Sequence, residues 1–62
     1  MAKNPEFRKL LVLKEVADVL RISPRSVQRL VKDQNLRALR VGGSLRFHQD
    51  DLERFIERQR SN

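Results

Sequence analysis

The sequence predicts an α+β domain that is mostly helical, and three local patterns lead to this prediction. Aliphatic residues between positions 13 and 20 recur at helical spacing. Ser23-Pro24 is a strong helix start that follows closely on that segment. Gly42-Gly43 separates two stretches in which apolar and polar residues alternate, as they do in a β-hairpin. We therefore expect two helices joined by a tight turn, then a hairpin and a last helix.

The chain of 62 residues is long enough for one small domain. Residues 1–9 are polar and contain Pro5, so we expect them to form a flexible N-terminal arm. Residues 10–60 are expected to form the single domain. They begin with a short extended stretch, which predicts a short N-terminal strand.

The first helix carries its apolar side chains at i, i+3, i+4 and i+7, on Leu13, Val16, Ala17 and Leu20. Val12 is then the N-cap, and Glu15 lies where a capping box places its carboxylate. Because valine has no hydroxyl group, only half of that box can form.

Ser23-Pro24 marks the start of the second helix. Serine caps free backbone amides, and Pro24 takes the first helical position, where its missing N–H is not needed. This helix is expected to run from Pro24 to about Asp33. Only residues 21–23 separate it from the first helix, so the two form a helix-turn-helix unit.

The hairpin over residues 34–48 has two candidate registers. A two-residue loop, 42–43, mixes polar and apolar residues on both faces. A three-residue loop, 42–44, pairs Val41 with Leu45 and leaves one face apolar, so we prefer it.

The preferred register also places Arg40 opposite Arg46. Like charges that face each other across two strands are unfavourable unless an anion lies nearby. In this register the two arginines would therefore repel each other in the free protein.

Residues 50–60 return to helical spacing, with an apolar stripe on Leu52, Phe55 and Ile56. Acidic residues lie in the first turn and arginines in the last, which matches the helix dipole. We expect this last helix to be a structural brace that covers the core.

Lysine and arginine outnumber the acidic residues by 14 to 8, for a formal net charge of +6. Residues 1–49 hold eleven cations and four acids, whereas residues 50–62 hold three and four. This distribution indicates a polyanionic partner, with nucleic acid as the first expectation and an anionic membrane surface as the second. No apolar run approaches the roughly 18 residues of a transmembrane helix, so we expect a cytoplasmic protein without a membrane-bound segment.

The second helix is expected to be basic on its outer side. Its aliphatic residues lie together on a helical wheel, and the opposite side carries Arg25, Ser26, Gln28, Arg29 and Lys32. Arginine can bind guanine and glutamine can bind adenine, each through two hydrogen bonds, and serine can reach either a base or a phosphate. We therefore expect base contacts from Arg25, Ser26, Gln28 and Arg29, and a phosphate contact from Lys32.

The hairpin is expected to add phosphate contacts from Arg37, Arg40, Gly43, Ser44 and Arg46. The segment 34–48 contains three arginines and no acid, and glycine at the turn permits close approach to a sugar-phosphate backbone. The alternative is an edge hairpin whose arginines only guard against aggregation.

An enzyme is not expected, because the sequence shows no nucleophile–base set, no phosphate loop and no carboxylate pair around a pocket. The chain has no cysteine, and the lone His48 cannot form a metal site. We expect no metal, no cofactor and no small-molecule substrate. RNA is a weaker expectation than DNA, because no aromatic residue lies on the basic face.

The order of these elements resembles the excisionase-type, MerR-like winged helix-turn-helix domains. The resemblance covers residues 10–56, and "LLVLKEVADVL", "SPRSV", "ALRVGG" and "RFHQDDLE" carry it. It implies a DNA-binding protein whose second helix enters the major groove. It also implies that the hairpin, called the wing in these domains, lies against the backbone or the minor groove.

Four positions depart from the family pattern. Val12 replaces a serine or threonine cap, and Arg21 occupies a turn position that is commonly glycine. Gln34 lies where glycine usually ends the second helix, so a left-handed conformation there would cost about 1–2 kcal/mol unless Asn35 takes that role. Ser44 replaces a frequent arginine or lysine at the wing tip.

The resemblance and the basic surface together predict a sequence-specific double-stranded DNA-binding protein of bacterial or phage origin. Because we expect the 62 residues to be the whole chain, without an effector domain, the favoured role is an excisionase, a recombination directionality factor. Its partners would be a site-specific recombinase (integrase) and further copies of itself on adjacent sites. A small transcriptional regulator is the close alternative, and a protein-interaction adaptor that uses the C-terminal helix is the third.

Overall fold

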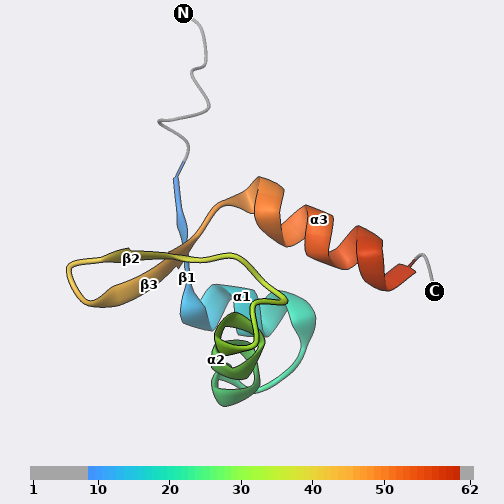
Figure 1. Ribbon diagram of the computed structural model, residues 1–62, viewed down its shortest axis with the longest axis horizontal. Helices are drawn as coiled ribbons and strands as arrows, with labels where there is room; N and C mark the ends of the chain where they lie inside the picture. The colour runs from blue at the N-terminus through green and yellow to red at the C-terminus, as the bar shows by residue number, and fades with distance from the viewer. Residues whose placement is uncertain (1–8, 61–62) are drawn as a thin grey trace, which may run out of the picture.

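The computed structural model describes residues 9–60, which form three helices and a small antiparallel sheet (Figure 1). The elements in chain order are β1 (Leu11–Val12), α1 (Leu13–Leu20), α2 (Pro24–Lys32), β2 (Leu39–Val41), β3 (Ser44–Phe47) and α3 (Gln49–Arg60). The predicted α+β class and winged helix-turn-helix order are confirmed. The predicted N-terminal arm lies outside the described residues except for Lys9.

The three strands form a sheet in the order β1-β3-β2, with both neighbouring pairs antiparallel. β1 is the predicted N-terminal strand, and it pairs Leu11 with Phe47 and Val12 with Arg46. The strand that enters the domain is therefore hydrogen-bonded to the strand that leaves the hairpin. This pairing holds the start of α1 beside the wing.

The preferred hairpin register is wrong: the loop has two residues, and Val41 pairs with Ser44 rather than with Leu45. The turn explains why, because φ is +59° at Gly42 and +88° at Gly43. Positive φ at both central residues is what a type I′ turn requires, and the twist of that turn matches the twist of the strands. A uniform apolar face is not needed at the hairpin tip, where Val41 is half exposed to solvent.

The observed register also separates the two wing arginines that we expected to face each other. Arg40 pairs with Leu45, whereas Arg46 pairs with Leu39. Since neighbouring residues of β3 point to opposite faces of the sheet, Arg40 and Arg46 belong to opposite faces. The half-buried Arg46 side chain instead donates from Nη1 to the carbonyl oxygen of Leu45 at 2.9 Å. The expected repulsion between two paired arginines therefore does not arise in the observed register.

The starts of the first two helices follow their local sequences. The amide of Val12 donates to Oε1 of Glu15 at 2.9 Å, which is the half capping box that valine permits. In α2 the Ser23 hydroxyl accepts the amide of Ser26 at 3.1 Å, and Pro24 takes the first helical position. Both predicted helix starts are confirmed.

Both helices of the helix-turn-helix unit end at a left-handed residue that is not glycine. These residues are Arg21, with φ of +60°, and Gln34, with φ of +64°. After α2, the amide of Gln34 donates to the carbonyl of Val31 at 3.0 Å, and the amide of Asn35 donates to that of Leu30 at 2.9 Å. This is a Schellman motif, and Gln34 rather than Asn35 takes the left-handed position within it.

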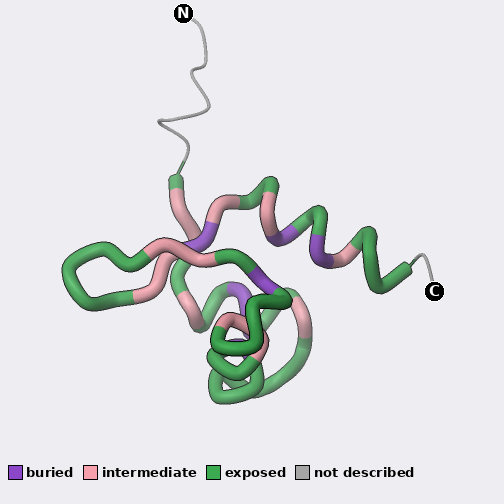
Figure 2. Tube along the Cα trace, in the orientation of Figure 1, coloured by how far each residue is buried: buried purple, intermediate pink, exposed green. Residues whose placement is uncertain are grey.

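The core lies where α1, α2, the sheet and α3 as far as Ile56 meet, and Figure 2 shows that the hairpin tip stands outside it. Its buried side chains are Val16, Ala17, Val27, Leu36, Phe47, Leu52 and Phe55. The stripe predicted on the last helix is confirmed, since Leu52 and Phe55 are buried and Ile56 packs against them half-buried. Leu36 fills the core from the segment between α2 and β2; the sequence predicted a hairpin from residue 34, but its first strand begins only at Leu39.

Candidate nucleic-acid interface

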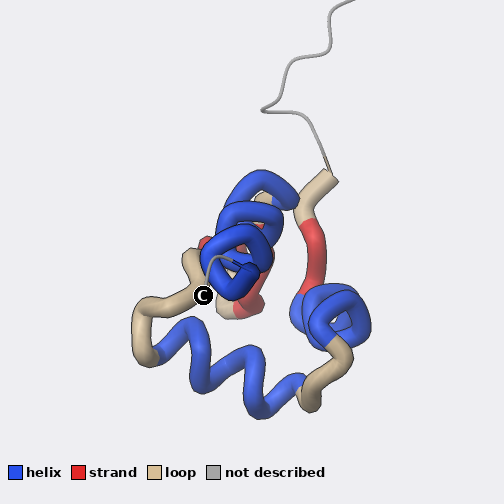
Figure 3. Tube along the Cα trace, turned by 90° about the vertical axis from the view of Figure 1, so that its right-hand side faces the viewer, coloured by secondary structure: helices blue, strands red, loops and turns tan. Residues whose placement is uncertain are grey.

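The helix-turn-helix unit and the hairpin form one side of the molecule. The hairpin of β2 and β3 extends in one direction and α3 in the other (Figure 1). In Figure 3, α1 is seen almost end-on while α2 runs across the view, so the two helices cross steeply. Such a crossing exposes one long face of the second helix, as in other helix-turn-helix units.

A groove of about 860 Å³ lies between α2 and the hairpin. Its lining residues are Val12, Leu13, Lys14, Pro24, Gln28, Val31, Lys32, Arg40, Gly43, Ser44, Leu45 and Arg46. Pro24, Gln28 and Lys32 are spaced four residues apart and form the wall that α2 contributes. Among these described residues four carry a positive charge and none carries a negative charge, so the groove attracts a polyanion.

The outer face of α2 is as open as its sequence predicts. Val27 is fully buried and anchors the helix, whereas Arg25, Arg29 and Lys32 are all exposed. None of these three side chains has a hydrogen bond or an ion pair with a residue of the described range 9–60. Their charged groups are therefore available to a partner outside the chain.

The four predicted base-contacting residues lie at different places on α2. Gln28 lines the groove, while Arg25 and Arg29 stand exposed beside it on the same helix. Ser26 belongs to the N-cap, because its hydroxyl lies 2.9 Å from the Ser23 hydroxyl and its amide is bonded to the same oxygen. The structure thus brings Gln28 to the groove and gives Ser26 a structural partner.

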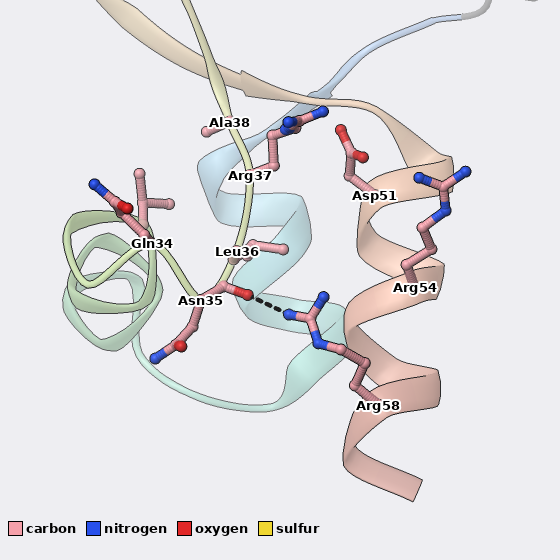
Figure 4. A pocket seen from close by; sticks show the side chains of 9 residues that line it. Gln34, Asn35, Leu36, Arg37, Ala38, Asp51, Arg54 and Arg58 are labelled. Carbon is pink, nitrogen blue, oxygen red and sulfur yellow. Dashed lines mark hydrogen bonds between the residues drawn. The ribbon is translucent and has the colours of Figure 1, made fainter. Parts of the chain in front are cut away.

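Five of the six predicted phosphate-contacting residues line the groove: Lys32, Arg40, Gly43, Ser44 and Arg46. Arg37 does not. It precedes β2 and lies in a separate hollow between the segment 34–38 and α3 (Figure 4). Arg46 also lines the groove, and one nitrogen of its side chain is already bonded to a backbone carbonyl.

Sequence reasoning missed Lys14. This exposed lysine lies in the first turn of α1 and lines the groove beside Arg40 and Lys32. Its position depends on the pairing of β1 with β3, which brings the start of α1 to the base of the wing. The sequence signals only that Lys14 lies off the apolar stripe of its helix, and that signal does not distinguish it from any other surface lysine.

No group of three or more histidine, aspartate or glutamate side chains within residues 9–60 is placed to hold a metal ion. None of the helices described is both long enough and apolar enough to cross a membrane.

Two steeply crossed helices, an open cationic face on the second and a hairpin beside it define a winged helix-turn-helix DNA-binding domain. A family model described as a helix-turn-helix domain matches residues 10–60, and the chain belongs to this family. The protein is therefore a sequence-specific binder of double-stranded DNA. Comparisons with curated proteins and with solved structures gave no match.

Proposed function

We propose that this protein is an excisionase, a recombination directionality factor that binds adjacent DNA sites and bends the duplex for a site-specific recombinase. Binding is its whole activity, and no catalytic step belongs to it. The resemblance to excisionase-type, MerR-like domains supports this role, and family membership supports the DNA binding on which it depends. Such a protein, whether it is encoded by a bacterium or by a phage, works on DNA in the cytoplasm.

The observation that carries the proposal is the groove without acidic residues between α2 and the wing. An α-helix fits the major groove, and the N-terminal residues of a recognition helix contact base edges there. Arg25, Gln28 and Arg29 are the side chains that read bases in this arrangement. Lys32 near the end of the helix and Arg40 on the wing bind the phosphates on either side.

Lys14 adds a third phosphate contact at the base of the wing. The three cations Lys14, Lys32 and Arg40 come from three different elements but line one groove. Contacts from separate elements set the orientation of a protein on the duplex, although they carry no sequence information.

A single domain of this size binds DNA with modest affinity. A single small domain buries roughly 600–1,000 Å² on DNA, so copies on adjacent sites increase the total affinity through their effective concentration. Several copies side by side also impose a bend, which is what a directionality factor needs in order to bring recombination sites together.

The test is footprinting followed by a recombination assay. The binding site is first selected from a pool of random duplexes, and DNase footprinting then compares the ends of the cognate mobile element with its promoters. Protection at the element ends, together with faster excision by the cognate integrase, is the expected result. Protection of a promoter with changed transcription and unchanged excision would identify a transcriptional regulator, the second candidate, which uses the same groove.

A further inference from the structure

The tip of the wing carries no charge, although the rest of the hairpin is basic. The hairpin arginines, Arg40 and Arg46, lie on either side of the tip in the sequence. The tip stands outside the core and extends away from α3 (Figures 1 and 2). Its residues are Val41, Gly42, Gly43 and Ser44. An uncharged tip is poorly suited to bind phosphates by charge, so its chemistry suits a different part of the duplex.

Val41 is the one large side chain at this tip. It is 50% exposed, and it belongs neither to the buried core nor to the half-buried residues packed around the core. Its cross-strand partner Ser44 is small, and the two turn residues are glycines. A single exposed valine is ordinary on a protein surface, so its position relative to the DNA-binding groove decides what it can contact.

Val41 points away from the groove between α2 and the wing. Arg40 lines that groove, and Val41 follows it directly in β2. Neighbouring residues of a strand point to opposite faces of the sheet. Val41 is accordingly not one of the groove's lining residues. The wing thus turns a cation toward α2 and an aliphatic side chain away from it.

The position of the duplex gives this direction a meaning. When α2 lies in the major groove, the adjoining sugar-phosphate strand lies between α2 and the wing, within reach of Lys32 and Arg40. The neighbouring minor groove of DNA lies on the far side of that strand, and it is only about 6 Å wide. The side of the wing that turns away from α2 therefore meets the minor groove. Gly42 and Gly43 have no side chains that would widen the tip as it enters.

We propose that Val41 enters this minor groove and selects A·T over G·C base pairs there. In the minor groove both kinds of pair present acceptors, but only G·C adds the N2 amino group of guanine as a donor. An aliphatic side chain occupies the space into which that amino group projects and cannot accept its hydrogen bond. A buried donor without an acceptor is unfavourable, so G·C is rejected. The inference rests on the DNA binding of the proposed function and deepens it, because it makes the wing a reader of sequence.

The experiment measures binding to the selected DNA site by fluorescence anisotropy. Each A·T pair in the flank of the site is replaced in turn by G·C or by inosine·C, which differs from G·C only in lacking the N2 amino group. At the pair that the wing reaches, G·C is expected to weaken binding about tenfold, which is within the usual range for one changed base pair. Inosine·C should restore the affinity of the A·T duplex.

Variants of Val41 assign this discrimination to its side chain. Val41→Ser should bind the G·C and inosine·C duplexes equally, and its Tm should stay close to that of the parent because the side chain lies outside the core. Val41→Ile keeps an aliphatic surface and should keep the discrimination. Val19→Ser is the matched control, because Val19 is an equally exposed valine on α1 that lies outside both the groove and the wing. It should retain the affinities of the parent chain.

Two results would overturn the proposal. One is equal binding of G·C and inosine·C by the parent chain at every flanking position, since no amino group would then be sensed in the minor groove. The other is full discrimination by Val41→Ser, which would assign the preference to groove shape or to another side chain.

Neither result depends on recombination, so the two proposals can fail separately. If Val41→Ser loses the discrimination but the parent chain does not stimulate excision, the proposed function fails while the role of Val41 stands. If the parent chain stimulates excision but binds the G·C and inosine·C duplexes equally, the role of Val41 alone is rejected.

Discussion

The two longest helices of this protein, α2 and α3, are both rich in arginine, but they use their charges differently. Within Pro24–Lys32 there is no acidic residue, and the cations point away from the core without partners in the described chain. Within Gln49–Arg60 acidic residues and arginines are mixed, and two of the arginines bond to other groups of the protein. Arg60 pairs with Glu57 at 3.3 Å, and Arg58 bonds to the loop after α2.

The arrangement of charge on a helix, rather than its amount, therefore identifies the face that meets DNA. A helix of mixed sign satisfies part of its charge internally and can serve as a brace. On a helix that carries only positive charges, the side chains repel one another until an anion approaches, so the exposed face of such a helix is suited to DNA.

The largest effect is expected from removing the Phe55 side chain, which holds α3 on the core. Phe55 is 8% exposed and packs in the core, so Phe55→Ala should lower the free energy of unfolding by about 3–5 kcal/mol. Urea denaturation followed by circular dichroism measures the loss. The matched control Glu53→Ala, at an exposed position of the same helix, should stay within about 0.5 kcal/mol of the parent. An unchanged midpoint for Phe55→Ala would mean that α3 does not brace the core.

The second-largest effect is expected on DNA binding, from changes on the outer face of α2. Arg25→Ala or Arg29→Ala should cost about 1–3 kcal/mol in binding to the selected DNA site and relax the preference at particular bases. Fluorescence anisotropy on the selected site and on single-base variants measures both quantities. Arg60→Ala on α3 is the control and should leave the affinity unchanged. Equal losses on every duplex would instead make these arginines phosphate contacts.

A smaller effect is expected at the left-handed residue that follows α2. Gln34 is left-handed, so Gln34→Gly should stabilise the protein by about 1 kcal/mol. For a domain of this size that corresponds to a rise in Tm of about 4–8 °C. Asn35→Gly is the matched control and should not stabilise, because Asn35 does not have positive φ. A higher Tm for the Asn35 variant alone would contradict the observed cap.

The smallest change in free energy is expected on the wing. Arg40→Ala should lower the slope of log binding constant against log salt concentration by about one unit on all sequences, as the loss of one phosphate contact requires. Arg54→Ala on α3 should leave the slope unchanged. The stability of the free protein should change by less than about 0.5 kcal/mol, because Arg40 pairs with Leu45. A clear gain in stability would indicate that Arg40 faces Arg46 across the strands, which would contradict the observed hairpin register.

The helix starts could be predicted because their causes are local. Ser23 and Pro24 act on amides within one turn, and Glu15 reaches back three residues to Val12. The outer face of α2 was also predictable, because helical periodicity alone separates Val27 from the arginines around it.

The hairpin register was not predictable from apolar patterning. Patterning favoured a three-residue loop, but the type I′ turn at Gly42-Gly43 determined the pairing, and the tip of the hairpin lies too far from the core for burial to oppose it. The same limit applies to Arg37, which sequence order grouped with the wing and which the fold places beside α3.

The helices, the tight turn between them and the unbalanced charge of α2 follow from the local sequence, because each depends on residues within a few positions of one another. Which cations share a surface depends instead on the tertiary structure. The pairing of β1 with β3 brings Lys14 to the groove, and the segment that buries Leu36 in the core also places Arg37 in the hollow between residues 34–38 and α3. Both depend on contacts between segments distant in the chain, and local periodicity carries no information about such contacts.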